Sequence, residues 1–193
     1  PMPTKRMKKM YLQPEVAERQ YVVGTDPGFG GTGLALFKNK TLQNVLWLRD
    51  IRKKSFVERA HSLASDIDGW ICGEINKIGG GSNFTERPAI VCEIPAYQNT
   101  PSRSMGWKKG DLQKLTYFVG AIGYACSTSC YNDKLHTYPE FITVSPAGWK
   151  GQLSKQIVID RIKRKYSDVE KRFQPKLDVW DAIGIGLWAI EEF

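Results

Sequence analysis

Two short apolar segments of this sequence each end in a carboxylate residue. Asp26 follows the apolar run 21–25 and Glu93 follows the run 89–92, and both runs have the length and composition of buried β-strands. Functional side chains gather at strand ends in α/β proteins. These acids therefore predict a site as well as a sheet, although an Asp that precedes Pro and Gly, as Asp26 does, is also common in simple turns.

Two further carboxylates interrupt an apolar segment near the end of the sequence. Residues 177–185 follow a helical pattern in which Asp178 and Asp181 lie on one face. Carboxylates packed together repel one another and favour protonation unless a cation lies between them. Mg²⁺ and Mn²⁺ prefer oxygen ligands, and two such ions roughly 3.5–4 Å apart can activate water and stabilise the leaving oxygen of a phosphodiester. We therefore expect one divalent-metal site formed by Asp26, Glu93, Asp178 and Asp181.

The segments that carry these acids resemble the RuvC-type Holliday-junction resolvases of the ribonuclease H-like superfamily. The resemblance spans about residues 20–192 and rests on the segments 24–36, 91–93 and 178–184. It implies that the acids are the metal-binding catalytic tetrad, with Mg²⁺ as the cofactor and Mn²⁺ as its substitute. It also implies a homodimer. True ribonucleases H differ, because their Glu lies on the first helix and an Asp ends the fourth strand.

The order of predicted elements agrees with this fold class. Alternating and helical apolar patterns predict strands at about 20–26, 32–38, 42–50, 88–93 and 141–144, and helices at about 55–77, 111–130, 153–166 and 176–192. The expected architecture is α/β, with a five-stranded mixed sheet flanked by helices. A chain of 193 residues that is 41% hydrophobic fits one domain. We assign residues 1–18 to a basic N-terminal arm and residues 19–193 to a single nuclease domain.

The charge balance indicates a polyanionic partner. The chain has 28 Lys and Arg residues against 20 Asp and Glu residues, a net charge of +8. Because several acids would be committed to metal, the remaining surface is more basic still. Nucleic acid is the expected partner.

The segment 94–110, which follows Glu93, has the composition of a DNA-binding loop. It is rich in Gly and Pro and interleaves aromatic with basic side chains, namely Tyr97, Arg103, Trp107, Lys108 and Lys109. Aromatic rings that stack on bases, beside cations that bind phosphates, suit unpaired or branched DNA. The resemblance implies that Tyr97 helps to open the junction, although it lies one position further from the Glu than in the bacterial pattern.

A second basic segment follows the predicted fifth strand. Gly148 and Gly151 bracket Lys150 in an expected loop, and Lys155 begins a helix whose N-terminus favours anions. We expect both lysines to bind the phosphate beside the metals, and the resemblance, which also places lysines here, implies a catalytic role for Lys150. The basic residues at 161–165 have the pattern of a solvated helix face.

Compartment and redox state follow from what the sequence lacks. The four cysteines do not have the spacing of a zinc site, so we expect buried, reduced thiols. No signal peptide and no apolar run of roughly eighteen residues is present, which predicts a cytoplasmic protein without membrane contact. The length and the long loop at 94–110 resemble viral or mobile-element resolvases, in a bacterial cell or a virus-infected host cell.

Three functions remain open at this point. The leading hypothesis is a Mg²⁺-dependent endonuclease that resolves Holliday junctions or other branched DNA by paired, symmetric phosphodiester hydrolysis, as in DNA recombination and repair. The second is a ribonuclease H-fold nucleotide phosphotransferase, because residues 26–32 also resemble the first phosphate loop of actin-like ATPases. That class needs a second phosphate loop and a much longer chain. The third is a catalytically silent junction-binding protein, which would gain nothing from four converging acids.

Overall fold

The centre of the molecule is a mixed five-stranded sheet. The computed structural model describes residues 14–28, 30–49, 55–79, 88–94, 109–128 and 139–193. The strands lie in the order β3-β2-β1-β4-β5, with bounds β1 (Tyr21–Asp26), β2 (Thr32–Lys38), β3 (Thr41–Leu48), β4 (Ala89–Glu93) and β5 (Glu140–Val144). The strand β2 is antiparallel to both β1 and β3, while β4 is parallel to β1 and β5 is parallel to β4. The predicted five-stranded mixed sheet is confirmed.

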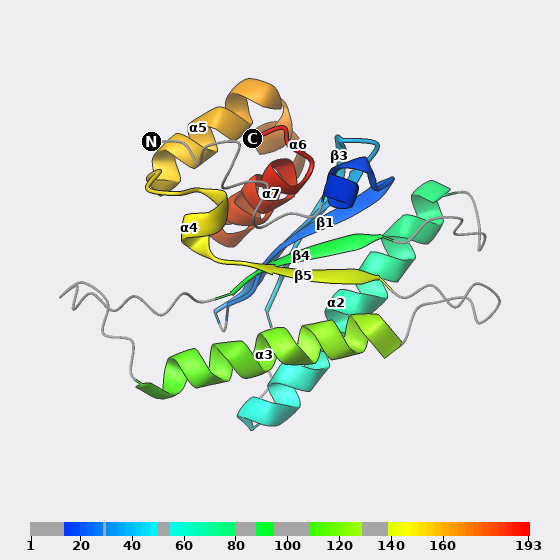
Figure 1. Ribbon diagram of the computed structural model, residues 1–193, viewed down its shortest axis with the longest axis vertical. Coiled ribbons are helices and arrows are strands. Elements are labelled where there is room, and N and C mark those ends of the chain that lie inside the picture. Colours follow the sequence, from blue (N-terminus) through cyan, green and yellow to red (C-terminus); the bar gives the residue numbers. More distant parts are fainter. Residues whose placement is uncertain (1–13, 29, 50–54, 80–87, 95–108, 129–138) are drawn as a thin grey trace.

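Helices cover both faces of this sheet, as Figure 1 shows. One face carries α2 (Phe56–Gly79) and α3 (Lys109–Thr128), and the other carries α4 (Pro146–Trp149), α5 (Lys155–Lys165), α6 (Val169–Phe173) and α7 (Leu177–Ala189). Every predicted strand and helix is present, with ends shifted by at most three residues. No helix within the described ranges is long and apolar enough to cross a membrane.

Three short helices were not predicted. They are the 3₁₀ helix η1 (Pro14–Glu18), α4 and α6, each of five residues or fewer. Such lengths are too short to produce a periodic apolar pattern. The helix η1 lies at the end of the segment that we assigned to the basic arm, and its Val16 is fully buried in the core.

The alternation of side chains along the strands decides which acids meet which helices. Val22 on β1 belongs to the core that packs against α7, whereas Val23 belongs to the core that packs against α2 and α3. Successive residues of a strand point to opposite faces. Asp26 is therefore on the same face as Val22 and Gly24, and Glu93 is on the same face as Val91.

The helix α7 lies directly on the backbone of the sheet. A Cβ atom on Gly24 would be 2.1 Å from the carbonyl oxygen of Ala182, and one on Gly33 would be 2.1 Å from the carbonyl oxygen of Asp178. No side chain fits into such gaps, so glycine is required at both positions. The consequence is a close backbone contact between α7 and the strands β1 and β2.

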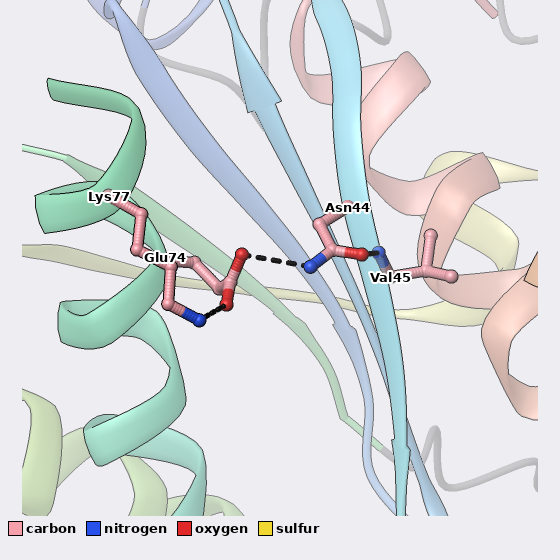
Figure 2. A network of polar contacts seen from close by, with 4 residues as sticks. All are labelled: Asn44, Val45, Glu74 and Lys77. Carbon is pink, nitrogen blue, oxygen red and sulfur yellow. Dashed lines mark hydrogen bonds and ion pairs between the residues drawn. The ribbon is translucent and has the colours of Figure 1, made fainter.

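A polar network on the opposite face ties α2 to β3, as Figure 2 shows. Asn44 donates a hydrogen bond of 2.8 Å to one carboxylate oxygen of Glu74, and Lys77 donates one of 2.6 Å to the other. These donors, Lys77 first, lower the pKa of the Glu74 carboxyl. Its contribution to stability is therefore present at neutral pH and is lost as the pH falls through the lowered pKa. Glu74 is a structural acid whose two oxygens are both satisfied.

The cysteines differ in part from expectation. Cys92 and Cys126 are free and buried, as predicted. Cys72 is disulfide-bonded, so the prediction of a reduced thiol is wrong at this position. The spacing of cysteines along a sequence does not show which of them meet, because disulfide bonds join residues that the fold brings together.

We predict that Gly24→Ala destabilises the protein, because the new methyl group would push α7 away from β1. The expected loss is about 2–3 kcal/mol in the free energy of unfolding, the upper range for overpacking, measured by urea denaturation. The matched control is Gly120→Ala on the exposed side of α3, where, in the described part of the chain, the added Cβ would have no neighbour within 4 Å apart from the adjoining backbone of its own helix. That control should be neutral or slightly stabilising, since Ala favours a helix over Gly. Equal stability of the two variants would contradict the packing described here.

Candidate functional site

Asp26 and Glu93 stand side by side at one edge of the sheet. The strands β1 and β4 are parallel, with Thr25 paired to Cys92, so the next residue of each strand is one of these acids. Both acids follow buried strand residues and are themselves half-buried. The carboxyl ends of adjacent parallel strands thus place two acids together.

The other two predicted acids come from the first turns of α7. The backbone of Asp178 lies against Gly33, which is the residue of β2 paired with Asp26. Asp181 follows one helical turn later and is 6% exposed. The free N–H groups at the start of a helix favour negative charge, which suits Asp178 in the first turn. The contact between Gly33 and the backbone of Asp178 therefore places the first turns of α7 beside the end of β1 that bears Asp26.

The electrostatics of Asp26 shows that the four acids form one group. Burial raises the pKa of its carboxyl well above the ordinary value, and the negative charges of Glu93, Asp181 and Asp178 raise it further. The positive charge of Lys155 lowers the pKa of Asp26, but by less than these effects raise it. Desolvation and nearby like charge both disfavour the ionised form. Asp26 is thus an acid whose charge is unfavourable in the absence of a cation.

Glu93 has a similar but better compensated environment. Burial raises the pKa of its carboxyl, whereas a hydrogen bond from the indole of Trp149 and the charge of Lys150 lower it. The net effect is that the pKa of Glu93 is raised above its ordinary value. Both strand-end acids therefore hold protons more tightly than acids in water do.

The two predicted lysines lie beside the acids of α7. The ammonium group of Lys155 is 2.7 Å from one carboxylate oxygen of Asp181, and that of Lys150 is 4.0 Å from the other. We predicted that Lys150 lies in a loop bracketed by glycines, and this is wrong. Ser145 is the N-cap of the one-turn helix α4, and Lys150 is its C-cap. Gly151 then adopts a positive φ of 61°, a conformation that suits glycine, and leads the chain into α5.

Two tryptophans that the sequence analysis did not assign also contact the acids. The indole nitrogen of Trp47 donates a hydrogen bond of 3.0 Å to Asp178, and that of Trp149 donates one to Glu93. Trp47 comes from β3 and Trp149 from α4. The one available signal was the residue type, since buried indole N–H groups usually find an acceptor.

The donor set fits a hard divalent cation. All four acids supply carboxylate oxygens, the ligands that Mg²⁺ and Mn²⁺ prefer, and one oxygen of Asp181 is buried without a hydrogen-bond partner among the described residues. In the described part of the chain, no three His, Cys, Asp or Glu side chains converge tightly enough to hold a metal as they stand. In this arrangement Lys155 is in contact with Asp181.

The remaining predicted DNA-binding residues cannot be placed. Tyr97, Arg103, Trp107 and Lys108 lie outside the described residues. Lys109 begins α3, and its side chain also lies outside what the structure describes. Their roles stay predictions.

Comparison with known proteins identifies the fold. No protein-family model matches the sequence, and no curated protein sequence does. Solved structures match over most of the chain. Thermus thermophilus RuvC in complex with a Holliday junction substrate has a TM-score of 0.58 at 16% identity, covering 88% of this chain and 92% of that chain. A second Thermus thermophilus RuvC structure has a TM-score of 0.53 at 17% identity, covering 87% and 92%.

A mitochondrial protein has the same fold. The yeast mitochondrial Holliday junction resolvase Ydc2 matches with a TM-score of 0.53 at 14% identity, covering 97% of this chain and 85% of that chain. The chain is therefore an α/β protein of the ribonuclease H-like fold. More particularly, its fold is that of the RuvC-type resolvases, as the sequence motifs predicted. The viral or mobile-element origin is not supported by these similarities.

We predict that Asp26→Asn stabilises the metal-free protein. Because the folded protein raises the pKa of Asp26 above its ordinary 3.8, this residue's contribution to the free energy of unfolding falls as the pH rises from about that value. The substituted protein loses that dependence and should be more stable than the unaltered protein at pH 7.5, with a difference that shrinks as the pH falls toward 3.8.

Urea denaturation in EDTA measures this difference. Asp160→Asn, which changes an exposed acid of α5, is the control and should have little effect. If Asp26→Asn instead makes the protein less stable than its unaltered form, the carboxylate is not under electrostatic strain.

Proposed function

We propose that this protein is a divalent-metal-dependent endonuclease that resolves Holliday junctions or closely related branched DNA. The observation that carries the proposal is the desolvated carboxylate of Asp26, whose charge is coupled to those of Glu93, Asp178 and Asp181 at one edge of the sheet. A purely structural role does not account for this arrangement, because the lysines that pair with Asp181 leave the pKa of Asp26 well above its ordinary value. The fold shared with RuvC-type resolvases supports the same function.

The roles proposed for the residues follow from their positions. Asp26, Glu93, Asp178 and Asp181 would hold one or two Mg²⁺ ions, for which Mn²⁺ would substitute. Bound there, such ions supply a water activated for attack on a phosphodiester and stabilisation of the leaving oxygen. Lys150 and Lys155 lie within 4.0 Å of Asp181 and would bind phosphate oxygens of the strand to be cut. Each lysine thereby holds the substrate next to the acids.

The preference for branched DNA requires more than charge, because every duplex offers phosphates. The net charge of +8 supports DNA binding in general. For selectivity we propose a homodimer, in which two acid clusters related by two-fold symmetry reach two opposed strands of a junction and cut them symmetrically. Tyr97 or Trp107 would stack on bases that are freed at the branch point, with Arg103, Lys108 and Lys109 on nearby phosphates.

We predict that synthetic four-way junctions are nicked in the presence of Mg²⁺ and that linear duplex of the same sequence is cut far more slowly. Asp26→Asn should abolish cutting while junction binding, measured by gel shift, is retained, because one carboxylate of the proposed metal site is lost. The control Asp160→Asn, at an exposed position on α5, should cut normally. A flap substrate in the same assay tests which branch is preferred. Mg²⁺-dependent cutting that survives Asp26→Asn would overturn the assignment of the site.

We also predict that Lys150→Ala and Lys155→Ala weaken junction binding and lower its salt dependence. Each lost phosphate contact should reduce the slope of log K against log salt by about one unit. Binding is measured in EDTA so that no strand is cut. The matched control is Lys165→Ala on α5, whose ammonium group pairs with Glu192 at 2.6 Å. Equal slopes for all three variants would show that DNA passes over another face of the protein.

A further inference from the structure

Two of the four clustered carboxylates are each held by the indole of a tryptophan. Trp47 donates a hydrogen bond of 3.0 Å to Oδ2 of Asp178, and Trp149 donates one to Oε2 of Glu93. From this geometry we infer that Trp47 and Trp149 are positioning residues of the candidate metal site. Each fixes one oxygen of a carboxylate and would leave the other oxygen available to a cation. The inference rests on the proposed function, because it concerns the same acids.

The chemistry of the indole suits this role. An indole N–H donates one hydrogen bond and accepts none, so it cannot act as a metal ligand. A carboxylate has two oxygens with about four lone-pair positions, and one hydrogen bond leaves the others available. Groups that hydrogen-bond to metal ligands fix the orientation of those ligands and raise the affinity for the metal. Trp47 and Trp149 therefore provide orientation without competing for the cation.

Trp149 is held rigidly enough to fix Glu93. Its side chain is fully buried, and its ring packs edge-to-face against Phe193 with centroids 5.7 Å apart. On the α7 side, a Cβ atom on Gly184 would lie 2.7 Å from the same ring. The glycine thus makes room for the indole, and the surrounding core packs around the ring. Because α4 carries Trp149 and β4 carries Glu93, the contact also fixes the strand end relative to α4.

Trp47 reaches Asp178 from the edge strand of the sheet. Its partner in the β2–β3 ladder is Gly33, the glycine against which the backbone of Asp178 lies. The indole passes over Gly31, where an added Cβ atom would be 2.2 Å from the indole nitrogen. Gly31, just before β2, therefore clears the path of the ring, while Gly33 within β2 makes room for the backbone of Asp178. The side chain is only partly buried, so the contact with Asp178 can be removed without opening the core.

A third tryptophan provides a matched control. Trp188 lies on α7, the helix that carries Asp178, and it is fully buried. Its indole nitrogen is buried and makes no hydrogen bond within the part of the chain that the structure describes. Trp188→Phe therefore removes a buried indole from the same helix without removing a donor to one of the four acids. A general effect of losing an indole from this core should therefore appear in Trp188→Phe as well, whereas loss of orientation should occur only in Trp47→Phe and Trp149→Phe.

The test is calorimetric titration of the DNA-free protein with Mn²⁺. Trp47→Phe and Trp149→Phe are expected to weaken Mn²⁺ binding about tenfold each, the lower end of the effect of removing a group that orients a metal ligand. Trp188→Phe should bind as tightly as the unaltered protein. In the nicking assay, the Mg²⁺ concentration for half-maximal cutting should rise by a similar factor in the two variants, while the rate at saturating Mg²⁺ recovers. A merely structural defect would lower the rate at every Mg²⁺ concentration.

The outcomes distinguish this inference from the proposed function. If the unaltered protein binds Mn²⁺ and both Trp47→Phe and Trp149→Phe bind it as tightly as Trp188→Phe does, the positioning role is wrong and the metal site stands. If the unaltered protein binds no Mn²⁺, the proposed function fails, and this inference fails with it. Should Trp149→Phe not fold, Trp47→Phe decides the question alone, because its ring lies at the edge of the core.

Discussion

The contact between the backbone of α7 and the strands β1 and β2 is the constraint on which the rest of this structure depends. Gly24 and Gly33 allow it, since a Cβ atom at either position would lie 2.1 Å from a carbonyl oxygen of the helix. Any side chain there would hold α7 further from the sheet, and the acids in its first turns would move with it. Because these two positions lack side chains, the helix that carries Asp178 and Asp181 touches the sheet that carries Asp26 and Glu93, and the four acids lie in one region.

The same contact creates an electrostatic problem that the surrounding residues reduce but do not remove. Asp26 is half-buried among like charges, and the resulting desolvation and repulsion raise the pKa of its carboxyl. Lys155 and Lys150 approach Asp181, while indole N–H groups reach Asp178 and Glu93. By contrast, the structural acid Glu74 has a donor on each oxygen and a lowered pKa. A carboxyl with a raised pKa among like charges, as at Asp26, is typical of functional sites. Such sites commonly lower the stability of the protein that contains them.

Much of the fold could be predicted because its signals are local. The apolar runs before Asp26 and Glu93 and the helical spacing of Asp178 and Asp181 each involve consecutive residues, and the structure places every one of these elements as expected. The short helix α4 could not be predicted, because one turn gives no periodic pattern. The indole contacts could not be predicted either. Trp47 and its partner lie 131 residues apart in the chain, and Trp149 and its partner lie 56 apart.

The sequence by itself determined which residue types are available and which face of each element they occupy. Alternation along β1 and β4 puts their terminal acids on the face that α7 covers, because the side-chain period of a strand is fixed by its backbone geometry. Only the tertiary structure decided that β1 lies beside β4, that α7 comes within backbone contact of the sheet, and that Lys155, Trp47 and Trp149 reach the acids. These contacts depend on how segments far apart in the chain pack together, and a pattern of consecutive residues does not determine that packing.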